Sequence, residues 1–257
     1  MSEGRVHYSA ANGIATVVFD RPEARNAMTW AMYGALGSAC EQIASDETVR
    51  VAVFRGAGGA FVAGTDIQQF TSFAGADDGI GYEKRIEAAI GQIEDLPKPI
   101  IAVVEGFCVG GGLAIASACD FRIASTSARF GVPIARTLGN CLSVGNVARL
   151  VAGFGADRTK RMLMLAEMIG AEEAAACGFV DVLADTGELD AKLDDMCKRL
   201  LSHAPITMRA AKEAVRRIRT ANLPEGSDLI RAAYGSADFK EGVAAFLTKR
   251  PPEWKGR

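Results

Sequence analysis

The sequence lacks the features of a secreted or membrane-spanning protein. Its six cysteines are scattered and no two form a C-x-x-C pair, a usage that indicates free thiols in a reducing compartment. No apolar run reaches the roughly 18–20 residues that a membrane span requires. The strand pattern begins at about Val6, which leaves no room for a signal or transit peptide. We therefore expect a cytoplasmic protein that does not associate with membranes.

The sequence also lacks an excess of either charge. Lysine and arginine number 29 against 31 acidic residues, so the formal net charge is −2 and the whole molecule does not attract nucleic acid. The one basic stretch, Lys212–Arg219, has the spacing of a solvated helix face. We therefore expect no nucleic-acid partner and no bound metal, and an anionic ligand would need a local basic patch.

What is present indicates an ordinary α/β protein. Of the 257 residues, 49% are hydrophobic and 23% are charged. Asn12-Gly13 predicts a β-hairpin between two β-rich runs, and apolar strands are expected at 49–55, 100–104 and 121–124. Helical spacing predicts helices at 27–43 and 80–96, a helix from about Leu113, and further helices at 159–166, 171–177, 189–201, 205–219 and 238–247. Alternating strands and helices followed by a helical layer favour an α/β core.

Two glycine-rich turns carry the strongest functional signal. Residues 60–67, AFVAGTDI, and residues 104–120, VEGFCVGGGLAIASACD, each read as a strand, a turn and then a helix. Such turns leave unpaired backbone N–H groups, which can stabilise a developing oxyanion by roughly 3–4 kcal/mol per donor. Neither the dinucleotide pattern G-x-G-x-x-G nor a P-loop is present. The alternative is that Gly110, Gly111 and Gly112 only allow a helix to pack closely on a strand.

With both turns in this order, the chain resembles the enoyl-CoA hydratase/isomerase family, the crotonase superfamily. The resemblance extends from RPEARNAM near the N-terminus through SARFGVP to FLTKRPPEW near the C-terminus. It implies an α/β fold, a crotonase-like spiral of ββα units over residues 1–195, with a C-terminal helical layer for oligomerisation over residues 196–257. It also implies acyl-CoA thioester substrates and a homotrimer or dimer of trimers. Coenzyme A would enter as part of the substrate, and we expect no covalently bound cofactor.

The resemblance implies roles for particular residues. The backbone N–H groups of Thr65 and Gly111 would form an oxyanion hole for the thioester carbonyl, and they would stabilise an enolate. The residues expected to contact coenzyme A are Arg25, Ala63, Asp66, Ile67 and Lys249. Lys249 would reach it from the same subunit or from another one. Solvated charges at Arg25 and Lys249, and a helix N-cap at Asp66, are the structural alternatives.

The acid/base residues typical of the family are missing. A typical hydratase has glutamates where this chain has Ala114 and, after the proline of FGVP, Ile134. Each lost proton transfer is worth about 10²–10⁴-fold, so efficient hydration is not expected. The loop at 137–146 offers Asn140, Cys141 and Ser143 as replacements, with Cys141 as the candidate nucleophile. Neither His7 nor His203 is close to this loop in the sequence. Arg136 could be the cationic neighbour that lowers the pKa of that thiol, or it could be a surface arginine.

The sequence leaves open the role of two glutamates and the choice between two functions. Glu83 and Glu87 lie on one face of a predicted helix, and a solvated face paired with Lys84 or Arg85 is favoured over a role in the acyl pocket. Residues between Phe70 and Ile90 are expected to line that pocket, in a segment that Gly75, Gly79 and Gly81 would make mobile. The sequence predicts an acyl-CoA enzyme with an altered acid/base set. A divergent acyl-CoA-binding trimer without hydratase activity is the alternative.

Overall fold

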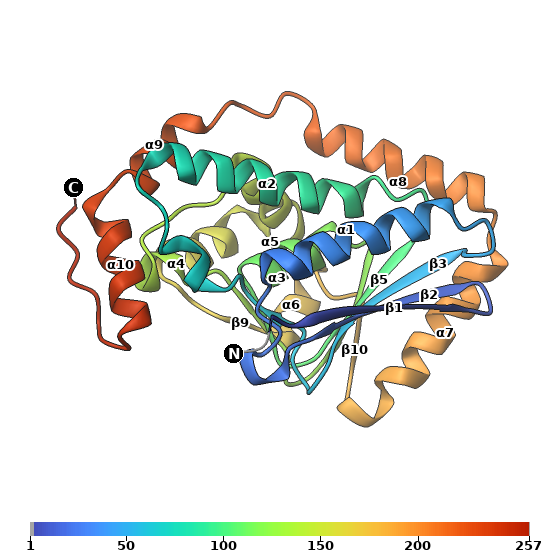
Figure 1. Ribbon diagram of the computed structural model, residues 1–257. Coiled ribbons are helices and arrows are strands. Elements are labelled where there is room, and N and C mark those ends of the chain that lie inside the picture. The colour runs from blue at the N-terminus through green and yellow to red at the C-terminus, as the bar shows by residue number, and fades with distance from the viewer. Residues whose placement is uncertain (1–2, 257) are drawn as a thin grey trace.

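The computed structural model describes residues 3–256, which form two β-sheets covered by helices (Figure 1). The larger sheet has the strand order β1-β2-β3-β5-β7-β10, and the smaller sheet has the order β4-β6-β8-β9. The strands of the larger sheet are β1 Arg5–Ala11, β2 Ile14–Asp20, β3 Val51–Gly56, β5 Ile100–Val104, β7 Phe121–Ser125 and β10 Val182–Ala184. Those of the smaller sheet are β4 Val62–Ala63, β6 Phe107–Val109, β8 Arg129–Gly131 and β9 Ile169–Gly170.

One unit is repeated along the first part of the chain. A strand of the larger sheet leads to a strand of the smaller sheet and then to a helix: β3, β4 and α2 Ala76–Glu94, then β5, β6 and α3 Gly111–Ala118, then β7 and β8 followed by α4 Ile134–Thr137 and α5 Val144–Met164. This repeat confirms the predicted spiral of ββα units. It also brings the ends of β4, β6 and β8 to one edge of the smaller sheet.

The central strands β3 and β5 of the larger sheet are buried on both faces, and their successive side chains point in opposite directions. Val51, Val53 and Ile101 pack toward α7 Leu189–Ser202. Ala52 and Phe54 pack on the other face, where α1 Trp30–Ser45, α2 and α3 contribute to the main core. Figure 1 shows α1 and α2 on one side of this sheet and α7 on the other. The continuous apolar strands of the sequence therefore belong to a two-sided core.

The predicted hairpin is confirmed. Asn12 and Gly13 have φ values of 52° and 82°, and β1 pairs with β2 in antiparallel register from Ala11↔Ile14 onward. Two residues with positive φ form the tight turn whose twist matches that of the strands. β5 also has the predicted bounds.

The C-terminal helices form two groups. α7 packs on β3, β7 and β10, so the predicted division at residue 195 falls inside a helix of the core. α8 Pro205–Thr220 has no buried residue. α9 Ser227–Tyr234 and α10 Ala237–Leu247 pack on α2 and on the short helix η2 Ile67–Phe70, which gives a third apolar cluster. The remaining short helices are η1 Pro22–Ala24, α6 Ala171–Ala176 and η3 Thr186–Glu188.

Gly79, one of the glycines expected to make the segment before Glu83 mobile, has a packing role in the structure. It is buried in α2, and a Cβ at this position would lie 2.2 Å from Cγ of Tyr234 in α9. A Gly79→Ala substitution should therefore destabilise the protein by about 1–3 kcal/mol, since α9 must move to admit the methyl group. Urea unfolding monitored by circular dichroism would measure the loss.

Gly81→Ala is the matched control for this effect. Gly81 lies in the same helix, is exposed and has no atom within 4 Å of the position that a Cβ would take. Alanine there should stabilise the helix by roughly 0.5–1 kcal/mol. Equal stabilisation by both substitutions would show that Tyr234 does not pack on Gly79 in solution.

Candidate active site

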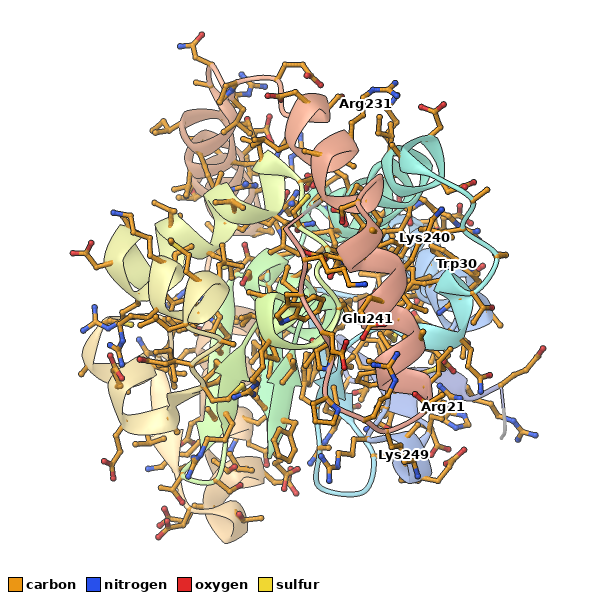
Figure 2. The ribbon with its side chains drawn as sticks, turned by 90° about the vertical axis from the view of Figure 1, so that its left-hand side faces the viewer. Arg21, Trp30, Arg231, Lys240, Glu241 and Lys249 are labelled. Carbon is orange, nitrogen blue, oxygen red and sulfur yellow. The ribbon has the colours of Figure 1, made fainter. Side chains whose placement is uncertain are left out.

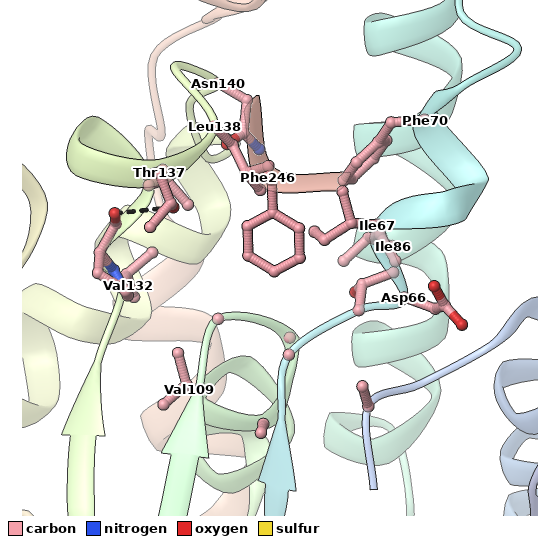
Figure 3. Close-up of a pocket in the computed structure, with 18 of the residues that line it drawn as sticks. Asp66, Ile67, Phe70, Ile86, Val109, Val132, Thr137, Leu138, Asn140 and Phe246 are labelled. Atoms are coloured by element: carbon pink, nitrogen blue, oxygen red, sulfur yellow. Dashed lines mark hydrogen bonds between the residues drawn. The ribbon is translucent and has the colours of Figure 1, made fainter. Parts of the chain in front are cut away.

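The two glycine-rich turns lie side by side at the ends of β4 and β6. These strands pair in parallel, with Ala63 opposite Val109, so the backbone turns after both strands at the same edge of the smaller sheet (Figure 3). Gly64 and Gly110 have φ values of 106° and 52°, a region that favours glycine. A Cβ on Gly110 would lie 3.7 Å from Cα of Gly64. These glycine conformations turn the backbone out of each strand. The next residue along the chain is Thr65 after β4 and Gly111 after β6.

Neither Thr65 N–H nor Gly111 N–H has an acceptor within residues 3–256. Gly111 begins α3, whose N-terminus carries a partial positive charge. The Thr65 hydroxyl is held by Tyr33 Oη at 3.0 Å and Tyr82 Oη at 3.2 Å. Two free amides at adjacent turns, one at a helix start, can bind an anionic oxygen.

A cavity of about 520 Å³ opens in front of these amides and is mainly apolar. Figure 3 shows Phe246 of α10 directed into it, opposite Val109. The residues that sequence analysis assigned to the site and that line this cavity are Arg25, Ala63, Thr65, Asp66, Ile67, Gly111, Ala114, Ile134, Asn140 and Lys249. Phe70, Tyr82, Glu83 and Ile86 line it from the segment predicted to form the acyl pocket. Cys141 and Ser143 are not among the lining residues.

Ala114 and Ile134, which stand in place of the usual glutamates, both line the cavity. Ala114 lies in the first turn of α3 and Ile134 begins α4 after Pro133. Both therefore present apolar side chains to the space in which a substrate would be bound. The cavity therefore has no carboxylate at these two positions.

Glu83 is the carboxylate that sequence reasoning misplaced. The expectation of a solvated face paired with Lys84 or Arg85 is wrong for this residue, because Glu83 is only 2% exposed. Its carboxylate accepts hydrogen bonds from Tyr234 Oη at 2.7 Å and from the Ser143 N–H at 2.9 Å. Tyr234 is 151 residues away in the sequence, so no local pattern could have predicted this burial.

Burial sets the protonation of Glu83. Desolvation raises the pKa of its carboxyl to about 7, although the hydrogen bonds from Tyr234 and Ser143 act in the opposite direction. Glu87, one turn further along α2, differs because its carboxylate bonds to Arg149 at 2.6 Å, and this partner holds the pKa of Glu87 below its usual range despite partial burial. The two glutamates therefore have different chemistry, and only Glu83 lines the cavity.

The structure argues against Cys141 as a nucleophile. Burial, and then the nearby charge of Glu83, raise the pKa of its thiol to about 12, so the reactive thiolate is not formed near neutral pH. Its Sγ donates to the Leu229 carbonyl at 3.6 Å. Arg136 is exposed and is not among the groups that shift this pKa. His7 bonds to Asp20 at the edge of the large sheet, and His203 caps α7.

Asn140 and Ser143 support Glu83 from the loop before α5. Asn140 Nδ2 donates to Tyr234 Oη at 3.1 Å, and its buried Oδ1 has no donor among the residues that the structure describes. Ser143 Oγ caps α5 by accepting from the Asn146 N–H, and it donates to Glu87. The backbone of Ser143, rather than its hydroxyl, is therefore the part that contacts Glu83.

The residues expected to contact coenzyme A surround the mouth of the same cavity. Arg25 is exposed, and its guanidinium carbon lies 4.7 Å from the centre of the Phe107 ring. Lys249 is exposed beyond the last turn of α10, on the same side of the molecule as Arg21 (Figure 2). Asp66 caps η2 and forms an ion pair with buried Arg21 at 2.8 Å. The N-cap alternative for Asp66 is confirmed, and its carboxylate is already engaged.

Two other classes of site are not found in the described part of the chain. No group of three or more histidine, cysteine, aspartate or glutamate side chains within residues 3–256 could hold a metal ion. None of the helices in that range is long and apolar enough to cross a membrane.

Comparison with known proteins identifies the family to which this chain belongs. A family model described as enoyl-CoA hydratase/isomerase matches residues 9–257. The mitochondrial methylglutaconyl-CoA hydratase of Homo sapiens is 32% identical over 253 residues, which cover 95% of this chain and 74% of that protein. A solved methylmalonyl-CoA decarboxylase in complex with 2-nitronate-propionyl-CoA has a TM-score of 0.90 at 26% identity over 98% of both chains. An enoyl-CoA hydratase from Mycobacterium avium subsp. paratuberculosis K-10 has a TM-score of 0.82 at 28% identity over 97% of this chain and 98% of that one. The chain therefore belongs to the enoyl-CoA hydratase/isomerase family, the crotonase superfamily of acyl-CoA-processing enzymes.

Proposed function

We propose that this enzyme stabilises a thioester enolate between the backbone N–H groups of Thr65 and Gly111, and that it does so without the glutamate pair of typical hydratases. The observation that carries this proposal is the pair of free amides at adjacent turns, facing an apolar cavity lined by Ala114 and Ile134. In such a cavity a preorganised donor contributes roughly 3–4 kcal/mol to a transition state with a charged oxygen. Enolate formation concentrates charge on the thioester oxygen, so the arrangement suits that step.

Coenzyme A would be held at the mouth of the cavity. Arg25 and Lys249 supply positive charge for its phosphates, and Ala63 and Ile67 flank the oxyanion turn where the adenine and pantetheine would lie. Asp66 contributes through its ion pair with Arg21, which fixes the turn, rather than as a free carboxylate. Both cationic groups are exposed, so their attraction to phosphate should weaken as salt is added.

Decarboxylation is a second candidate reaction. The structural similarity to methylmalonyl-CoA decarboxylase, with a TM-score of 0.90, favours it. Loss of CO₂ from a malonyl-type thioester generates the enolate directly, so no base is needed to remove a proton. An oxyanion hole in an apolar cavity is sufficient for that step, and one proton must then be added to Cα.

Oligomerisation is proposed for α8 and the adjoining C-terminal helices. Ile206, Val215 and Ile218 of α8 are exposed by 80%, 66% and 78%, although they are large and apolar. Apolar side chains gathered on one helix indicate an interaction surface. A homotrimer or a dimer of trimers would cover them, as the family resemblance implies.

A transition-state analogue tests the proposed enolate site. The compound 2-nitronate-propionyl-CoA is planar at Cα and carries delocalised negative charge, as an enolate does. It should bind at least about 10²-fold more tightly than propionyl-CoA, since complementarity to the transition state strengthens binding of its mimics. Titration calorimetry of the two ligands at the same pH and salt would measure the ratio. A protein that only binds acyl-CoA, the alternative function, would hold both ligands with similar affinity, and that result would contradict the enolate site.

A further inference from the structure

We propose that Glu83 is the acid/base group that moves the proton at Cα of the bound acyl group. This inference rests on the proposed function, because only a thioester bound in the cavity supplies that proton. It assigns the reaction to a carboxyl on α2 instead of the two positions now occupied by Ala114 and Ile134. It also predicts that a single carboxyl group, rather than a pair of glutamates, carries out proton transfer in this site.

The location of Glu83 is the first argument. Tyr82, Glu83 and Ile86 form the face of α2 that lines the cavity. Glu83 and Asp66 are the carboxylates among the lining residues, and Asp66 is already paired with Arg21 at 2.8 Å. Glu83 has no cationic partner in the described part of the chain. A buried carboxyl without a counter-charge is costly for folding alone, which favours a chemical role.

The connection to the oxyanion turn is the second argument. Tyr82, the residue next to Glu83, donates from its hydroxyl to Thr65 Oγ1 at 3.2 Å. The same oxygen contacts Tyr33 Oη at 3.0 Å. The start of α2 is thereby fixed against the turn that carries one of the two amides. A proton-transfer group must be held in position relative to the polarised carbonyl, and this contact provides that rigidity.

The surroundings of Glu83 determine how it titrates. Tyr234 of α9 and the Ser143 N–H donate to it, Asn140 donates to Tyr234, and the Cys141 thiol and the Glu87 carboxylate lie nearby. Burial raises the pKa values of Tyr82 and Tyr234 well above their ordinary range, so both phenols stay protonated. Arg149 neutralises Glu87 rather than Glu83. With its pKa raised to about 7, Glu83 is populated in both forms near neutral pH, as a group that accepts and returns a proton should be.

The proposed step balances in both candidate reactions. As a carboxylate, Glu83 removes the Cα proton; the electron pair of the C–H bond forms the enolate double bond, and the carbonyl electrons move to the oxygen held by Thr65 and Gly111. The reverse step returns a proton from the Glu83 carboxylic acid to Cα, and in D₂O it delivers a deuteron once that carboxyl group has exchanged its proton with solvent. In decarboxylation, the electrons of the breaking C–C bond form the enolate, CO₂ leaves, and the Glu83 carboxylic acid supplies a proton to Cα.

Exchange of the Cα protons of butyryl-CoA in D₂O tests the inference without knowledge of the natural substrate. Mass spectrometry would follow deuterium in the thioester for the wild type, Glu83→Gln, Glu83→Asp and the control Glu87→Gln. Removing a general base costs about 10²–10⁴-fold, so Glu83→Gln should lose at least 10²-fold in exchange while binding butyryl-CoA as the wild type does. Glu83→Asp should recover part of the rate. Glu87→Gln should keep its rate at high pH, because that carboxylate does not line the cavity.

The pH profile separates proton transfer from a structural role. Wild-type exchange should rise with pH through about 7 and then level off, as the Glu83 carboxylate forms. The hydrogen bond from Tyr234 lowers the pKa of Glu83, so Tyr234→Phe should move this rise to higher pH. A merely structural glutamate would leave the profile in place.

The exchange and binding experiments test Glu83 and the enolate site separately. A preference for the nitronate ligand together with full exchange by Glu83→Gln would overturn Glu83 and leave the enolate site standing. Wild-type binding of butyryl-CoA without any exchange would also overturn Glu83. Absence of the nitronate preference would instead remove the proposed function itself.

Discussion

Crotonyl-CoA hydration by this protein should be about 10²–10⁴-fold slower than by a family member that has both glutamates. Hydration requires one group to activate water and another to handle the proton at Cα. Glu83 can serve only one of these transfers, and Ala114 and Ile134 supply neither. The loss of enoyl-thioester absorbance, measured at equal enzyme concentrations, would give the ratio of the two rates.

The comparison needs a check that the ligand is bound. Calorimetric titration of the same sample with butyryl-CoA would show whether the coenzyme A site is intact. Slow hydration with normal binding is the expected result. A rate within tenfold of the glutamate-bearing relative would mean that a bound water or another side chain replaces both carboxylates, and the argument from Ala114 and Ile134 would be wrong.

Local patterns predicted the elements whose signal is short in range. The Asn12-Gly13 turn and β5 were found because a turn dipeptide and a continuous apolar strand each identify themselves within a few residues. The two glycine-rich turns were found because glycine is required where φ is positive and a neighbouring backbone is close. The amides of Thr65 and Gly111 follow from those turns, although their role stays a prediction.

Longer or weaker patterns were missed. The helix predicted at 159–166 corresponds to the end of α5, Val144–Met164. No helix was predicted for the first part of α5, whose start overlaps the loop expected at 137–146. Gly155 has φ 78° and kinks this helix. The eight-residue α9 was not predicted, and neither were β8 and β9, whose three and two residues are too few to show alternation.

Glu83 was misplaced for a different reason. The spacing of Glu83 and Glu87 is that of a solvated helix face, and the sequence contains no sign that α9 covers it. Tertiary contacts make the difference between the two glutamates, because Tyr234 covers Glu83 whereas Arg149 pairs with Glu87. Chemistry in this site therefore depends on packing between segments far apart in the chain, which a single sequence does not encode in any local pattern.

Replacing Gly111 with alanine should lower the rate of Cα exchange by about 10³-fold, because both oxyanion donors would be displaced. A Cβ at position 111 would lie 2.5 Å from Tyr33 Oη and 2.9 Å from Thr65 Oγ1, so these two side chains must shift, and the hydroxyl contacts that hold the Thr65 turn would be disturbed. Alanine itself is favourable at a helix start, and Gly111 is not among the residues with positive φ. The protein should therefore fold normally while turnover is lost.

Two further variants separate displacement of the donors from general damage. Gly81→Ala adds a methyl group to α2 where no atom lies within 4 Å, and it should leave exchange unchanged. The double variant Gly111→Ala/Tyr33→Phe removes the atom nearest to the new methyl group, so it should regain part of the lost rate. Binding of propionyl-CoA should fall less than binding of 2-nitronate-propionyl-CoA, since the amides contribute most when the oxygen is charged. If Gly111→Ala keeps both its exchange rate and its preference for the nitronate, then the two amides do not hold the thioester oxygen, and the enolate must be stabilised elsewhere in the cavity.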